Sequence, residues 1–217
     1  MDMSQTVTTG NTINRSNRNA LLLTAAIFIV PVIVAYTLLK TGWYAAAGTS
    51  NRGALIDPPI EFDQLALRDL QQQLIPAEQF RKKWWIMYVV PDVCDSACKN
   101  SLYLMRQTHQ ALGPEQPRVA ELIVMPQQVD AALAQWLTKE FPTALQTTAD
   151  AALVNQVLQP VLASNDAPSR AGHLYLVDTM GAIFMHYPSY ADEQESILKG
   201  RNLLKDLQRV LKLSKIG

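Results

Sequence analysis

KWWIMYVVPDVCDSACKNSLYLMRQTH, residues 83–109, is the stretch that decides the fold. It opens with an apolar run over residues 84–90, which is typical of a buried β-strand. After a Pro-Asp break, a helix-patterned segment extends over residues 96–112. The two cysteines of the chain, Cys94 and Cys98, lie at this strand-to-helix junction. Two thiols in such a position indicate either metal binding or redox chemistry.

The segments that follow alternate between strand and helix patterns. The sequence predicts a strand over 119–125, helices over 129–141 and 150–158, strands over 173–177 and 182–187, and a helix over 197–213. The order β-α-β-α-α-β-β-α predicts an α/β, thioredoxin-like domain. Its parallel strands are buried on both faces, which explains the nearly continuous apolar runs.

Composition and charge exclude some functions. The chain has 217 residues, of which 48% are apolar, so a folded domain with a substantial core is expected. It carries 19 basic and 19 acidic side chains. A balanced charge creates no field that would recruit nucleic acid, and we expect no nucleic-acid partner.

Residues 20–39, ALLLTAAIFIVPVIVAYTLL, contain no charge and are long enough to cross a bilayer as a helix. A proline such as Pro31 is tolerated in a membrane helix. Arg15 and Arg18 precede the span and Lys40 follows it, which favours a cytoplasmic amino terminus.

A cleaved signal peptide is the alternative, because Ala45 to Ala47 offer a small-residue site. The apolar stretch is longer than the apolar region of a signal peptide, which has roughly 7 to 15 residues, so we expect an uncleaved anchor. The predicted parts are a cytoplasmic polar tail (1–19), a transmembrane helix (20–39), a linker (40–54) and an exported thioredoxin-like domain (55–217). In a bacterium, this is a single-pass inner-membrane protein with a periplasmic domain.

The spacing C-x-x-x-C leaves three chemical interpretations open. Residues one helical turn apart are too distant for a disulfide, so bridging requires Cys94 to lie in the loop before the helix. The helix macrodipole favours a thiolate, particularly at Cys98. Thiolates bind Cu(I) or exchange disulfides. A structural disulfide, a thiol-exchange pair and a copper site all remain as alternatives.

A closed copper site needs a third ligand, usually an imidazole. His109 lies about 16 Å along the helix axis from Cys98 and is expected at a surface or helix end. His186, in the last strand, is a weak candidate. His173 is the best candidate to complete a site with Cys94 and Cys98.

With anchor, cysteine loop and final hairpin identified, the chain resembles the Sco/SenC family over residues 55–213. These are membrane-anchored thioredoxin-like proteins that assist copper delivery or thiol reduction in cytochrome c oxidase assembly. The most specific part of the resemblance is WWIMYVVPDVCDSACKNSLYLM, and LYLVDTMG (174–181) is similar to a family segment of the type YLIDPDG. The resemblance implies that Cys94 and Cys98 are the copper and redox cysteines.

The resemblance does not extend to the family's histidine ligand. Aligning Leu176 on the family's YLI leucine places Arg170 at the ligand position, and His173 comes three residues later, on the opposite face of a strand. Asp95 replaces a proline, and Val124 to Pro126 replace an acidic motif. Arginine does not bind cations, but beside the cysteines it would stabilise a thiolate.

These observations predict an accessory factor in cytochrome c oxidase assembly that acts through Cys94 and Cys98, with copper as an optional cofactor. Its expected partners are the membrane and either oxidase subunits or other assembly factors. We do not expect an ordinary turnover enzyme. The alternatives are a periplasmic thiol-disulfide oxidoreductase and a non-catalytic interaction module with a structural disulfide.

Overall fold

The residues that a computed structural model of the protein describes are 13–41, 51–159 and 172–214. Side chains are described from residue 18 onward. The chain divides into two compact units, Met1–Ser50 and Asn51–Gly217. Most of the predicted polar tail and of the predicted linker lies outside the described residues, as does Arg170.

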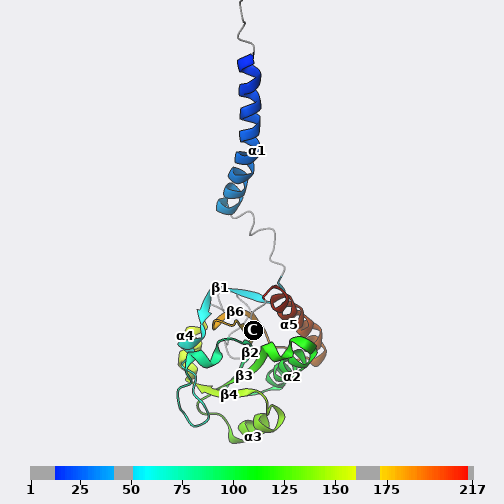
Figure 1. The fold of residues 1–217 in the computed structure, drawn as a ribbon. Helices are drawn as coiled ribbons and strands as arrows, with labels where there is room; N and C mark the ends of the chain where they lie inside the picture. Colours follow the sequence, from blue (N-terminus) through cyan, green and yellow to red (C-terminus); the bar gives the residue numbers. More distant parts are fainter. Residues whose placement is uncertain (1–12, 42–50, 160–171, 215–217) are drawn as a thin grey trace, which may run out of the picture. The chain divides into compact units, whose positions relative to one another are not determined.

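The described part of the first unit is helix α1 (Ile13–Thr41) (Figure 1). Its segment Arg18–Lys40 is long and apolar enough to cross a membrane, and it is not buried against protein. The Thr24 hydroxyl donates to the Ala20 carbonyl at 2.9 Å, which satisfies this polar group within the helix. The predicted transmembrane helix is therefore confirmed as a candidate, and its helical structure continues beyond residues 20–39.

The second unit is built on one six-stranded sheet with the order β1-β6-β5-β2-β3-β4 (Figure 1). The strands are β1 (Ala54–Glu61), β2 (Trp84–Val89), β3 (Val119–Pro126), β4 (Leu145–Ala149), β5 (Leu174–Val177) and β6 (Ala182–Tyr187). The helices are α2 (Ser96–Ala111), α3 (Ala131–Glu140), α4 (Ala151–Val157) and α5 (Glu193–Leu213). Strands β2, β3 and β4 are parallel, whereas β5, β6 and β1 pair antiparallel with their neighbours. The predicted α/β class is confirmed.

Every residue of β2 is buried, because helices or loops cover both faces of the sheet. Ile86 and Tyr88 belong to a core formed with α2, α3 and α5. Trp85 and Met87 point to the other face, into a second core formed with α4 and residues 62–80. The alternation of side chains along a strand thus divides one apolar run between two cores.

The sequence pattern does not predict strand β1. Leu55 pairs with Met185 and Ile60 with Ile183 on β6, and the register shifts between these two pairs. Pro58 lies in the segment where the register shifts, and its ring nitrogen cannot donate a hydrogen bond to a neighbouring strand. The segment is therefore tolerated only at a sheet edge. Its proline content makes the segment resemble a linker in the sequence.

The sequence pattern also misses β4, which lies at the other edge. Its threonines look polar, but Thr147 and Thr148 are buried. Backbone groups on the outer side of the strand are hydrogen-bonded at Thr148. Arg68 N donates to Thr148 O at 2.9 Å, and Thr148 N donates to Arg68 O at 2.8 Å. Because this pairing comes from a distant loop, a local pattern cannot indicate it.

The remaining helix and strand boundaries agree with the prediction to within about two residues, with one exception. Helix α5 begins at Glu193 rather than at Ile197. Asp192 caps it by accepting a hydrogen bond from Glu195 N at 2.8 Å. This cap starts the helix one turn before its apolar face begins.

Candidate functional site

Cys94 and Cys98 form a disulfide, with their Cα atoms 5.1 Å apart. Cys98 lies in the first turn of α2, whereas Cys94 precedes that helix in the loop after β2. The loop position of Cys94 is the one that the sequence analysis requires for bridging, since two residues in regular helix at this spacing lie too far apart.

The two sulfurs differ in exposure. Cys98 is 1% exposed, whereas Cys94 is only half-buried. Cys94 lies along an open groove of about 450 Å³ between the cysteine loop and α3. The groove also includes Lys99 and Trp136, whose ring lies 5.9 Å from the Lys99 ammonium. An incoming molecule can therefore reach Cys94 but not Cys98.

Asp95 is the N-cap of α2, and its carboxylate accepts a hydrogen bond from Cys98 N at 3.0 Å. This bond satisfies one of the free N–H groups at the start of the helix. It also places a negative charge one residue from Cys94, where it opposes the effect of the helix macrodipole on a thiolate.

Tyr88 brings a polar group into the core beneath α2. Its side chain is fully buried, and its hydroxyl makes no hydrogen bond among the described residues. Burial raises the pKa of Tyr88, and the charge of Asp95 raises it further, while Ser101 lowers it without reaching hydrogen-bonding geometry. The hydroxyl therefore remains protonated at physiological pH.

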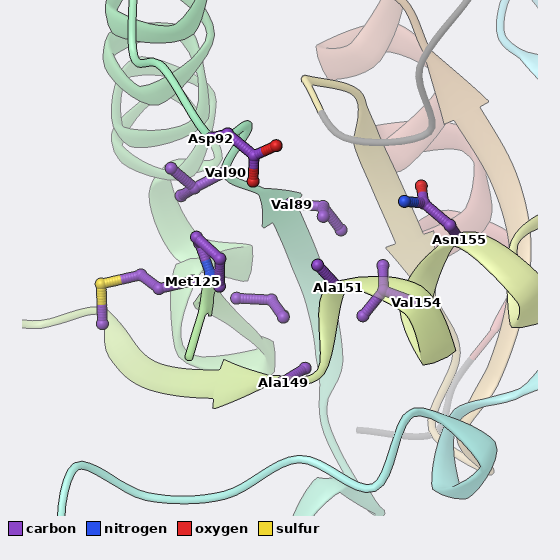
Figure 2. Close-up of a pocket in the computed structure, with 10 residues that line it drawn as sticks. Val89, Val90, Asp92, Met125, Ala149, Ala151, Val154 and Asn155 are labelled. Atoms are coloured by element: carbon purple, nitrogen blue, oxygen red, sulfur yellow. The ribbon is translucent and has the colours of Figure 1, made fainter. Parts of the chain in front are cut away.

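A small apolar pocket of about 60 Å³ lies at the carboxyl ends of the parallel strands (Figure 2). Figure 2 shows Val89 and Val90 from the end of β2, Asp92 from the cysteine loop, and Val154 with Asn155 from α4. In open α/β sheets this edge is where ligands bind. The cysteine loop leaves the sheet at the same edge, so the pocket and the disulfide are neighbours along the chain.

The structure does not bring His173 together with the cysteines. Val89 N donates to His173 O, which continues the β2–β5 ladder and places His173 on the Val89 side of the sheet. Cys98 packs in the core on the opposite side. His173 instead pairs with His186, with the two Nδ1 atoms 3.4 Å apart, and both rings are buried.

His109 lies near the end of α2, as expected, but its side chain is half-buried and contacts β3. Its Nε2 lies 2.9 Å from the Val119 carbonyl, and its Nδ1 lies 3.9 Å from the carboxylate of buried Glu121. Burial raises the pKa of Glu121, and the nearby His109 opposes that rise. The pair ties α2 to β3, away from the cysteine loop.

Among the described residues, no three side chains of His, Cys, Asp or Glu gather as a metal site. When reduced, the cysteines supply two soft ligands, and His173 does not add a third. Arg170, which the alignment places at the family's ligand position, falls outside the described residues. The residues that the structure describes do not fit a closed copper centre.

Comparison with known families gives one assignment. Residues 84–214 match the family described as "Transmembrane-like, thioredoxin-like, C-terminal domain". The chain belongs to this family. This confirms the predicted thioredoxin-like fold, and the matched region contains both cysteines. A search of curated proteins finds no significant match.

Solved structures with similar folds include yeast Sco1, with 14% identity and a TM-score of 0.49 over 77% of this chain and 98% of that one. A thiol:disulfide interchange protein from Bacteroides has 16% identity and a TM-score of 0.48 over 75% and 91%. Copper-bound ScoI from Bradyrhizobium japonicum has 16% identity and a TM-score of 0.42 over 69% and 98%.

The buried histidine pair predicts a loss of stability in acid. Burial, together with the neighbouring His186, lowers the pKa of His173 to about 4, and burial also lowers the pKa of His186. Between about pH 6.5 and 4 the unfolded chain therefore binds protons that the folded chain does not. We expect the free energy of unfolding of residues 51–217 to fall by roughly 2 kcal/mol from pH 7 to 4.5.

Urea denaturation across this range measures the effect. His173→Asn should flatten the pH dependence, whereas Asn155→Ala, which changes an exposed and non-titratable side chain of α4, should preserve it. If the free energy of unfolding fell with pH as steeply in His173→Asn as in the natural sequence, the histidine pair would not be the cause of the acid sensitivity.

The two roles of Asp95, as a helix cap and as a negative charge near Cys94, can be tested separately. Asp95→Asn keeps an N-cap oxygen but removes the charge, so stability should change by less than about 0.5 kcal/mol. Without that charge a thiolate at Cys94 is favoured, and alkylation of the reduced chain at pH 7 should become several times faster. Iodoacetamide kinetics measure this rate.

Asp150→Ala is the matched control, because Asp150 caps α4 in the same way, accepting from Leu153 N at 2.8 Å. It should cost about 1 kcal/mol of stability and leave alkylation unchanged. Equal alkylation rates in Asp95→Asn and the natural sequence would show that the Asp95 charge has no influence on the sulfurs.

Proposed function

We propose that this protein is a membrane-anchored thiol-disulfide factor that assists cytochrome c oxidase assembly through Cys94 and Cys98. The observation that carries the proposal is the unequal exposure of the two sulfurs in one disulfide at the start of α2. The Sco/SenC-like sequence around the cysteines supports cytochrome c oxidase as the complex whose assembly the protein assists. Membership of a transmembrane-like, thioredoxin-like family supports a redox role at a membrane.

The exchange reaction follows from this asymmetry. In the reduced chain, the Cys94 thiolate attacks one sulfur of a client disulfide, forms a mixed disulfide and releases the first client thiolate. The Cys98 thiolate then attacks the Cys94 sulfur and releases the second client thiolate. The chain ends with the disulfide seen here, and the client carries two thiols. A dithiol donor must reduce the chain again before another cycle.

The proposed location is the bacterial inner membrane, with the amino terminus in the cytoplasm and residues 55–217 in the periplasm. Helix α1 supplies the anchor, and the proposed linker of residues 40–54 is reduced to the segment between the end of α1 at Thr41 and the start of β1 at Ala54. The oxidising periplasm is consistent with a disulfide as the resting state. A client with the same membrane anchorage, such as an oxidase subunit or another assembly factor, is the partner that this location favours.

Copper enters the proposal only as cargo of the reduced cysteines. Two thiolates are soft ligands suited to Cu(I). The described residues add no third ligand near them, so no step of the exchange reaction involves the metal.

The oxidase role predicts that Cys94→Ser together with Cys98→Ser lowers the amount of assembled oxidase, measured by haem absorption and oxidase activity in membranes. Cys98→Ser alone should accumulate mixed disulfides at Cys94, because the resolving sulfur is missing. Cys94→Ser is the matched control and should accumulate none, because Cys98 is buried. A normal amount of assembled oxidase in the double variant would show that the thiols are not required for the proposed function.

A broad-specificity oxidoreductase is the second candidate, since the groove beside Cys94 is open enough to accept a polypeptide. The two candidates differ in the reduction of insulin. An assembly factor with a dedicated client should be nearly inert, whereas a general oxidoreductase should precipitate insulin within minutes. Rapid insulin reduction that is abolished by Cys94→Ser would favour the enzyme.

A further inference from the structure

The Tyr88 hydroxyl is a buried donor that lacks an acceptor in the disulfide form. The side chain is 0% exposed, and the hydroxyl makes no hydrogen bond among the described residues. Leaving such a group unpaired in the core costs about 1 to 3 kcal/mol. The cost is avoidable, because phenylalanine would fill the same space without the hydroxyl. A tyrosine here is explained if another state of the protein supplies the acceptor.

The position of the hydroxyl identifies that acceptor. Asp95, Cys98 and Ser101 are spaced by three residues at the start of α2, so they face the same side of the helix. The charge of Asp95 and the hydroxyl of Ser101 both act on the Tyr88 hydroxyl, and these two residues flank Cys98 on this side. Tyr88 and Cys98 also belong to the same buried core. The hydroxyl therefore lies against the face of α2 that carries the Cys98 sulfur.

The Cys98 sulfur changes character when the disulfide is reduced. In the disulfide it is bonded to Cys94 and is a poor acceptor. Reduction by a dithiol breaks the S–S bond, transfers two electrons and two protons to the pair, and leaves the donor as a disulfide. Cys98 then carries a free sulfur that burial shields from water. The free sulfur can accept a hydrogen bond from a neighbouring protein donor.

We propose that Tyr88 donates a hydrogen bond to the Cys98 sulfur in the reduced protein and so stabilises the dithiol state. Tyr88 is then a positioning residue for the exchange reaction, and its hydroxyl remains protonated throughout. The inference rests on the proposed exchange function of the cysteines. It adds a residue, six positions before Cys94, that sets how readily the pair is reduced.

The test is Tyr88→Phe in the full-length chain in detergent, equilibrated with reduced and oxidised glutathione. The fraction of disulfide is measured by thiol alkylation and mass spectrometry. Loss of the hydrogen bond should lower the equilibrium constant for reduction about tenfold, which corresponds to a potential about 30 mV more negative. An unchanged equilibrium, or a shift toward easier reduction, would overturn the proposal.

Thermal unfolding of the two redox forms provides an independent readout. In the oxidised chain, Tyr88→Phe removes an unpaired buried hydroxyl and should raise the melting temperature. In the reduced chain, it removes a hydrogen bond and should lower the melting temperature. A purely structural role for Tyr88 would shift both forms in the same direction, and that result would also overturn the proposal.

Two variants serve as controls. Tyr175→Phe removes the hydroxyl of another fully buried tyrosine, on the opposite face of the sheet, and should leave the glutathione equilibrium unchanged. Ser101→Ala should shift it by less than twofold. If Ser101→Ala instead reproduced the whole Tyr88→Phe shift, the acceptor would be Ser101 and not Cys98.

These measurements contain no client protein, so they do not depend on oxidase assembly. Normal oxidase in the double cysteine variant would refute the proposed function and leave the Tyr88 result standing. An unshifted potential in Tyr88→Phe would refute the role of Tyr88 and leave the exchange function untouched.

Discussion

The burial of β2 on both faces is the constraint on which the rest of the second unit depends. The strand lies between a parallel neighbour, β3, and an antiparallel one, β5, and its side chains alternate between two cores. Strand β2 leaves the sheet after Val89, and the segment that follows is the cysteine loop. The site is therefore fixed by packing, because the loop starts from a rigid strand and ends in a capped helix.

The same two-sided packing separates two kinds of chemistry. The cysteines, Asp95 and Tyr88 belong to the α2 side of the sheet, and the histidine pair lies on the other side. On the α2 side, the proposed chemistry is thiol–disulfide exchange at the cysteines. On the other side, His173 and His186 respond to protons. With the sheet between them, the acid sensitivity of the histidines and the redox behaviour of the cysteines should be nearly independent.

The sequence was sufficient for the central elements and for the cysteine loop. Strands β2 and β3 are long apolar runs, and the C-x-x-x-C spacing indicates that Cys94 lies before the helix if the pair is bridged. The sequence named His173 as the best third ligand, but the structure places it on the face of the sheet opposite to Cys98. Edge strands were beyond prediction, because β1 contains prolines and β4 contains threonines that are buried only by distant segments. The Tyr88 hydroxyl could not be found either, since a tyrosine in an apolar strand does not reveal whether its oxygen has a partner.

Both edges of the sheet are closed to additional strands. The prolines of β1, Pro58 and Pro59, offer no N–H groups, and Arg68 occupies the outer hydrogen-bonding positions of β4 at Thr148. A client peptide is thus hindered from extending the sheet as an extra strand, and two copies of the domain are hindered from joining edge to edge. Under the proposed function, a client is then recognised by side chains around the cysteine loop. The same arrangement limits edge-to-edge aggregation of the domain.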